Sequence, residues 1–128
     1  RSRMAERPES AEARDLLARC DGRAPLLTTR HVADAALAGN AVARRVFAEA
    51  CEAYGWALAQ MITLLAPNVV VLGGGVSLVG EELFLAPVRR AVDRYVFPPH
   101  RRSIEIRLAA LGEEVVLHGA MALASESL

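Results

Sequence analysis

Residues 68–77 read NVVVLGGGVS and follow directly on the Ala66-Pro67 break. The run from Val69 to Leu72 is rich in β-branched residues and shows no polar alternation, which predicts a strand buried on both faces, as in a parallel sheet. Three glycines follow the strand. Glycine allows a positive φ and lets a ligand approach the main chain, but a tight turn and close helix–strand packing would call for the same residues.

A second strand is predicted at Ile104–Leu108, IEIRL, where apolar and polar residues alternate and one face should be exposed. Between the strands, residues 81–95 have a helical pattern, with Pro87 opening a fresh first turn. The order strand–helix–strand predicts a right-handed parallel crossover, with the two strands as neighbours or near neighbours. Ligands bind such sheets beyond the carboxyl ends of the strands, which is where the glycines lie.

Three helices are predicted before the first strand. They cover residues 9–19, a short stretch from Thr28 or Thr29 to residue 38, and residues 41–66, for which Asn40 is well placed as the cap.

A last helix should run to about residue 124, with Glu113 and Glu114 in its first turn. We expect this helix and the long one to pack on the sheet. Glycine destabilises a helix interior, so Gly119 predicts a close approach to a neighbouring element. Tyr54 and Trp56 should fill the core around the long helix.

The composition describes one globular domain: 128 residues and 13.7 kDa, with 53% hydrophobic and 23% charged residues. The formal net charge is zero, so no overall field recruits nucleic acid or an acidic membrane. The basic residues are all arginine. This excludes Schiff-base chemistry by lysine and a GK[ST] phosphate loop from this chain.

Cysteine and histidine are sparse. Cys20 and Cys51 form no CxxC pair, which favours two free buried thiols in a reducing, cytoplasmic compartment over a disulfide. The three histidines, at 31, 100 and 118, are scattered and predict no metal site. The basic residues near the second strand, Arg89, Arg90, Arg94, Arg101 and Arg102, favour a solvated helix face or a subunit contact over nucleic-acid binding.

Four segments together resemble the C-terminal portion of the ROK family, which contains glucokinase-type sugar kinases and sugar-responsive transcriptional repressors. They are TTRHVADAALAGNAVARRVFAEACEAYGWALA, LLAPNVVVLGGGVS, EELFLAPVRRAV and IRLAALGEEVVLHGAMALA. The resemblance implies an α/β fold: a half-domain of the ribonuclease-H-like actin and sugar-kinase superfamily, with a parallel strand pair packed by helices. Residues 26–128 would form the adenosine-side lobe, and residues 1–25 a polar helical lead-in continuing from a missing N-terminal part, although Met4 leaves open a start within this chain.

The same resemblance implies that Gly73, Gly74, Gly75, Val76 and Ser77 border the adenosine of ATP in the complete protein. The family's DxGGT-like phosphate loop, catalytic aspartate, ExGH segment and cysteine-rich zinc motif do not occur here. No catalytic residue is therefore assigned, and ATP with magnesium, like the sugar substrate, belongs to the complete protein. We also expect a homo-oligomer, with no nucleic-acid contact from this segment and no membrane.

Two functions stay open on this resemblance. The parent is either an ATP-dependent hexose kinase or a sugar-sensing repressor whose effector domain keeps the fold. The intact GGGVS at residues 73–77 favours retained nucleotide binding and hence the kinase. A structural fragment without a ligand of its own is the third alternative.

Overall fold

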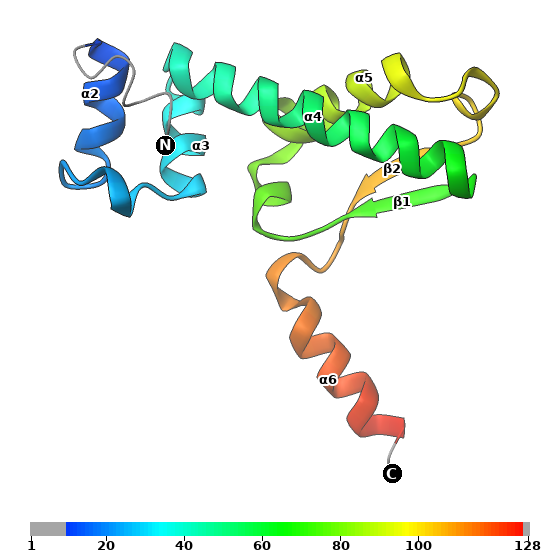
Figure 1. The fold of residues 1–128 in the computed structure, drawn as a ribbon. Helices are drawn as coiled ribbons and strands as arrows, with labels where there is room; N and C mark the ends of the chain where they lie inside the picture. The colour runs from blue at the N-terminus through cyan, green and yellow to red at the C-terminus, as the bar shows by residue number, and fades with distance from the viewer. Residues whose placement is uncertain (1–9, 127–128) are drawn as a thin grey trace.

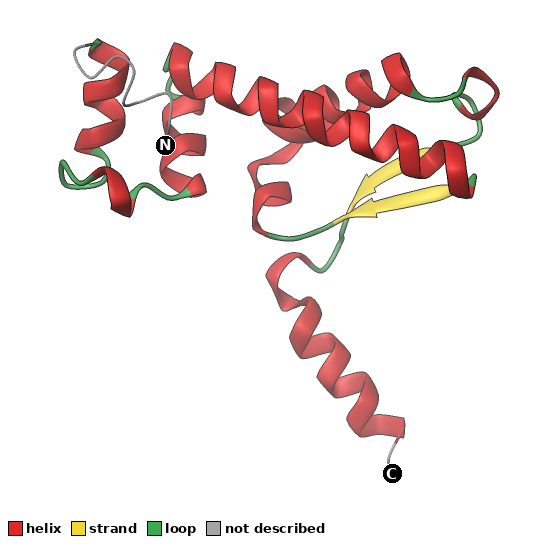
Figure 2. Ribbon diagram, viewed as in Figure 1, coloured by secondary structure: helices red, strands yellow, loops and turns green. Residues whose placement is uncertain are grey.

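The computed structural model describes residues 10–126 of the chain. Helices α2 (Ala11–Ala18), α3 (Thr29–Leu37) and α4 (Ala41–Leu65) precede strand β1 (Val69–Leu72). Helix α5 (Ala86–Tyr95), strand β2 (Glu105–Leu108) and helix α6 (Val115–Glu126) follow (Figures 1 and 2). The predicted helices and strands are all present, and the part of the first prediction at Glu9 lies outside the described residues. None of the described helices has the length and apolar character of a membrane span.

The two strands pair in parallel, as predicted. Val69 lies opposite Glu105, and Leu72 lies opposite Leu108. At the two ends of the ladder, the amide of Glu105 donates to the carbonyl of Asn68 at 2.9 Å, and the amide of Ala109 donates to the carbonyl of Leu72 at 2.8 Å. Helices α4 and α5 lie side by side over one face of this sheet (Figure 1).

Asn40 joins the N-terminal helices, besides capping α4 as expected. Its side-chain oxygen accepts from the amide of Ala43 at 3.0 Å. Its side-chain nitrogen donates to the carbonyl of Glu12 at 2.9 Å and to Oδ2 of Asp15 at 2.8 Å. Because the side chain is buried, these bonds satisfy groups that water does not reach. Asn40 thereby fixes α2 against the start of α4.

Two hydrophobic clusters hold the described residues together. The larger one lies between the sheet and helices α4 and α5, with Leu58, Ile62, Leu72, Val88 and Ile106 among its members. The smaller one joins α2, α3 and the first turns of α4 to Leu83, through Leu16, Phe47 and alanines of α3 and α4. A methyl group added to Gly55 would lie 2.4 Å from Cβ of Ala91, so α4 and α5 are in contact at their backbones there.

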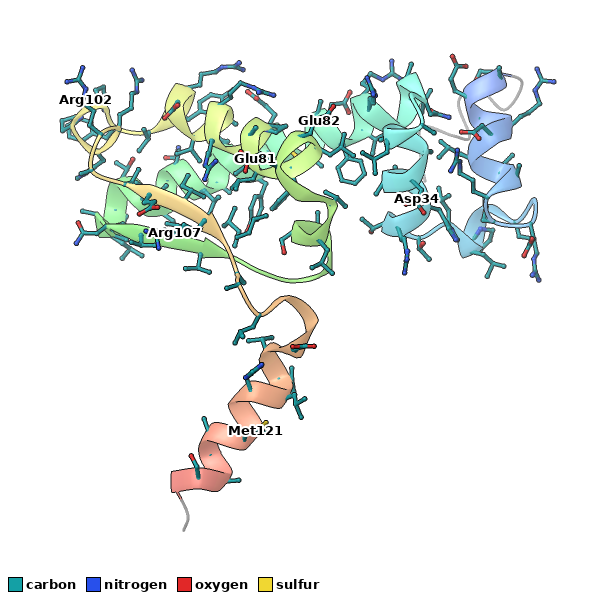
Figure 3. The ribbon with its side chains drawn as sticks, turned by 180° about the vertical axis from the view of Figure 1, so that it is seen from behind. Asp34, Glu81, Glu82, Arg102, Arg107 and Met121 are labelled. Carbon is teal, nitrogen blue, oxygen red and sulfur yellow. The ribbon has the colours of Figure 1, made fainter. Side chains whose placement is uncertain are left out.

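The prediction that β1 is buried on both faces is wrong for the described residues. Val70 and Leu72 face the helices, whereas Val69 and Val71 are 45% and 61% exposed. On the same open face of β2, hydrogen bonds from Arg107 lower the pKa of the Glu105 carboxyl (Figure 3). Helices α4 and α5 cover only one side of the sheet, so alternate side chains of each strand are left in solvent.

Arg89 and Arg94 form ion pairs and hydrogen bonds with other residues of the chain. Nη2 and Nε of Arg89 donate to the carbonyl of Ile106 at 2.6 and 3.2 Å, and Nη1 binds Glu81 at 2.8 Å. Nη1 of Arg94 binds Oε1 of Glu52 at 2.6 Å, and the same oxygen accepts from the hydroxyl of Tyr95. These guanidinium groups link α5 to β2 and to α4.

Helix α6 does not pack on the sheet, which corrects the expectation from sequence. Every residue from 114 to 125 is exposed, and α6 extends away from the other helices (Figures 1 and 3). Gly119 has no atom within 4 Å of an added Cβ, so it marks no close approach in this structure. The expected burial of Tyr54 and Trp56 is also wrong, since they are 42% and 53% exposed.

We predict that the 128-residue chain self-associates through α6. Val116 and Met121 are 78% and 62% exposed on it, and clustered apolar surface of this kind favours association. The double variant Val116→Glu, Met121→Glu should lower the mass measured by light scattering after size exclusion. Leu37→Glu, at a single exposed leucine on α3, is the control and should leave the mass unchanged. An unsubstituted 128-residue chain that is monomeric at all concentrations would refute this prediction.

Candidate functional site

The glycine segment after β1 requires glycine at one position in particular. Gly74 has φ 91° and ψ 170°, a region that residues with a Cβ rarely adopt. After it the chain turns through a short 3-10 helix, Gly75–Val79, and reaches Gly80 at φ 89° and ψ −166°. This turn thus lies between two glycines of almost the same conformation.

Ser77 holds this turn together. Its amide donates to the carbonyl of Gly74 at 3.0 Å, and its hydroxyl donates to the same oxygen at 2.7 Å. The residue is only 6% exposed. Of the five residues predicted at the site, Ser77 therefore stabilises the loop from within, while Gly73, Gly74, Gly75 and Val76 line a pocket.

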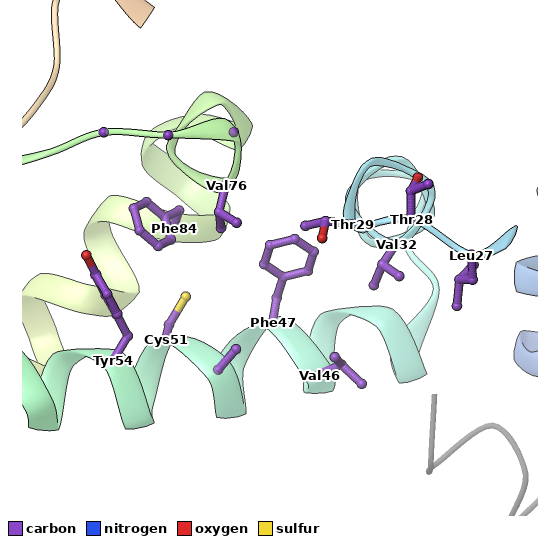
Figure 4. Close-up of a pocket in the computed structure, with 14 residues that line it drawn as sticks. Leu27, Thr28, Thr29, Val32, Val46, Phe47, Cys51, Tyr54, Val76 and Phe84 are labelled. Atoms are coloured by element: carbon purple, nitrogen blue, oxygen red, sulfur yellow. The ribbon is translucent and has the colours of Figure 1, made fainter. Parts of the chain in front are cut away.

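This pocket has a volume of about 560 Å³, within the range of small-molecule sites. The glycine segment forms one wall, and Phe84 lies beside it (Figure 4). Helix α3 supplies Thr29 and Val32, and the two residues before it supply Leu27 and the cap Thr28. Helix α4 supplies Val46, Phe47, Ala50, Cys51 and Tyr54. None of these lining residues carries a formal charge, so the pocket suits a largely apolar group with a few hydrogen-bonding atoms.

The walls from α3 and α4 are not part of the site that the sequence predicts. Their residues on α4 recur every three or four positions, which is also the pattern of a helix packed in a core. Tyr54 contacts Phe84 with ring centroids 5.8 Å apart and is itself 42% exposed. Such a pattern does not say whether a face of α4 meets a core or lines a cavity.

Both cysteines are buried and free, as expected. Burial raises the pKa of the Cys51 thiol, with the positive charge of Arg90 opposing this effect. Its Sγ donates to the carbonyl of Leu83 at 3.4 Å. Within residues 10–126, no cluster of three or more His, Cys, Asp or Glu side chains is placed to hold a metal ion.

Native Cys51 should therefore react slowly with iodoacetamide. A raised pKa lowers the thiolate fraction at neutral pH, and the thiolate is the reactive form. The alkylation rate, followed by mass spectrometry, should rise as pH is raised toward the thiol pKa and should rise much further in denaturant. Cys20, also buried, should be protected until unfolding as well. Rapid labelling of Cys51 in the native chain at pH 7 would contradict this assignment.

A parallel strand pair that ends in a glycine loop beside an apolar pocket is the arrangement of an α/β ligand-binding fold. The model of the ROK family matches residues 9–127. The chain therefore belongs to the ROK family.

Three similar proteins illustrate the relationship. The glucokinase of Streptomyces coelicolor is 34% identical over 120 residues, which cover 93% of this chain and 37% of that protein. The crystal structure of a ROK family glucokinase from Streptomyces griseus, in complex with glucose and AMPPNP, matches with a TM-score of 0.81 and 33% identity over 95% of this chain and 38% of that one. The xylose repressor of Caldicellulosiruptor bescii is 27% identical over 76% of this chain and 24% of that protein. The chain thus spans somewhat more than a third of the length of these two glucokinases and about a quarter of the length of the repressor.

Proposed function

We propose that this chain is the adenosine-side lobe of an ATP-dependent hexose kinase of the ROK type. The observation that carries the proposal is the uncharged pocket with Gly73–Val76 as one wall, at the carboxyl end of β1. Its support from relatives is the similarity to a glucokinase whose structure contains AMPPNP, an analogue of ATP. The proposal concerns the complete protein, of which a lobe this size would form a part.

The residues present fit a nucleoside. Phe47, Tyr54 and Phe84 offer flat apolar surface to a base. The glycines carry no Cβ, so a base or ribose can approach their main chain closely. The pocket lining offers no cation to phosphate groups, so we assign the triphosphate and its magnesium to residues outside the pocket. Phosphoryl transfer depends on those charged groups and on a residue that orients the sugar hydroxyl.

The second candidate is the effector domain of a ROK-type sugar-sensing repressor. The observation in its favour is the similarity to a xylose repressor over 76% of this chain. In that case the same lobe would serve a sugar-dependent conformational change without phosphoryl transfer. We propose a homo-oligomer for either parent.

The experiment is to express the full-length protein and to follow ADP formation with ATP and magnesium, with and without glucose or xylose. Sugar-dependent ADP formation is the expected result. ATP binding measured by calorimetry, combined with no turnover on any hexose or pentose, would reject the kinase. A sugar-dependent change in DNA affinity of the same protein would then favour the repressor. In the isolated 128-residue chain we expect weak nucleotide binding, because contacts to the phosphates are absent from its pocket.

A further inference from the structure

The polar side chains of the pocket share one chemical property. Those with a hydroxyl are Thr28, Thr29 and Tyr54, and a hydroxyl both donates and accepts as its hydrogen rotates. Thr28 accepts from the amide of His31 at 3.3 Å and keeps its own hydrogen to donate. Thr29 reaches from α3 toward Phe47 (Figure 4). No side chain with a fixed donor or acceptor pattern, such as asparagine, glutamine or a carboxylate, lines the pocket.

No other polar side chain of the lining presents a base with a fixed pattern of hydrogen-bond donors and acceptors. The thiol hydrogen of Cys51 is directed to the carbonyl of Leu83. The glycine main chain carries amides and carbonyls of fixed direction, and the carbonyl of Gly74 already accepts from the amide and the hydroxyl of Ser77. Amides suit ring nitrogens N3 and N7, which adenine, guanine and hypoxanthine all carry. The bases differ at position 6, where adenine has an amino donor and the other two have a carbonyl acceptor.

We propose that the pocket binds purine nucleotides without selecting the group at position 6, so that GTP and ITP serve as ligands along with ATP. This inference rests on the proposed function, because it names the ligand class of the same site. Strong discrimination between similar ligands requires buried polar groups that the wrong ligand leaves unpaired. Rotatable hydroxyls re-pair with either substituent, and Phe47, Tyr54 and Phe84 contact the faces that all purines share.

The test is calorimetric titration of the full-length protein with ATP, GTP and ITP in the presence of magnesium. We expect the three dissociation constants to agree within tenfold. ATP binding more than tenfold tighter than GTP or ITP would overturn the inference and leave the proposed function standing, since it would show that a main-chain group reads the 6-amino substituent. Failure of all three to bind would overturn the proposed function, and the inference with it.

A variant pair tests the assignment to Thr29. Thr29→Val should weaken the binding of ATP and GTP by similar factors, leaving their ratio unchanged within threefold. A change of the ratio beyond threefold would show that this hydroxyl selects one base, against the proposal. Thr63→Val is the matched control, because Thr63 lies outside the pocket and bonds the carbonyl of Ala59 and the amide of Phe97. It should leave both affinities unchanged, with folding of each variant verified by circular dichroism.

Discussion

Gly55→Val should lower the free energy of unfolding by about 3 kcal/mol, the upper end of the usual cost of overpacking a core. An added Cβ at this position would lie 2.4 Å from Cβ of Ala91 and 2.9 Å from the carbonyl oxygen of Val88. Neither neighbour is the flexible end of a long side chain, so α4 and α5 must separate. Because both helices cover the sheet, the separation would also disturb the larger core cluster. Thermal unfolding followed by circular dichroism should show a Tm lower by about 10 °C or more.

Gly119→Val is the matched control. Gly119 is also helical, but an added Cβ there meets no atom within 4 Å. Valine and glycine differ little in helix propensity, so this substitution should leave Tm nearly unchanged. If both variants have the same Tm as the unsubstituted protein, α4 and α5 are not in backbone contact at Gly55.

Gly74→Val should weaken nucleotide binding by the full-length protein by tenfold or more, a loss of about 1.4 kcal/mol. The side chain would occupy part of the pocket wall where the main chain is bare. It would also force valine into a positive φ, at a cost of roughly 1–3 kcal/mol in stability. A loss of binding must therefore be separated from a loss of folding.

Gly80→Val makes that separation. Gly80 has almost the same backbone conformation as Gly74, φ 89° against φ 91°, and does not line the pocket. Both variants should lose similar stability by thermal unfolding, and only Gly74→Val should lose nucleotide affinity in a calorimetric titration. Equal affinity in the two folded variants would mean that Gly74 serves the turn alone.

The local signals in the sequence were sufficient for the elements that depend on local chemistry. Thr28 and Asn40 cap helices because their side-chain oxygens accept from amides three residues on. The run at 69–72 forms a strand, and its neighbour in the sheet is the next predicted strand along the chain. Gly74 takes the positive φ that the glycine run allowed.

The errors concern what covers each surface. Val69, Val71 and Gly119 were expected to be buried because their residue types predict packing, but a sequence pattern does not say which segment supplies the partner. In the described residues, helices cover only one face of β1. The α3 and α4 walls of the pocket were missed for a related reason. A stripe such as Val46, Ala50 and Tyr54 has the same period whether it faces a core or a cavity.

The hydrogen bonds from Arg89 to the carbonyl of Ile106 affect the edge of the sheet to which a further strand can be added. Glu105 and Ala109 direct their main-chain groups toward β1, so those of Ile106 point the other way, to the outer edge of β2. Two guanidinium nitrogens occupy that edge carbonyl. On β1, by the same alternation, the main-chain groups of Val69 and Val71 point away from β2. Among residues 10–126, nothing pairs with that edge of β1. An incoming strand, whether it comes from the same protein or from another copy, therefore meets a blocked acceptor at β2 and an open ladder at β1.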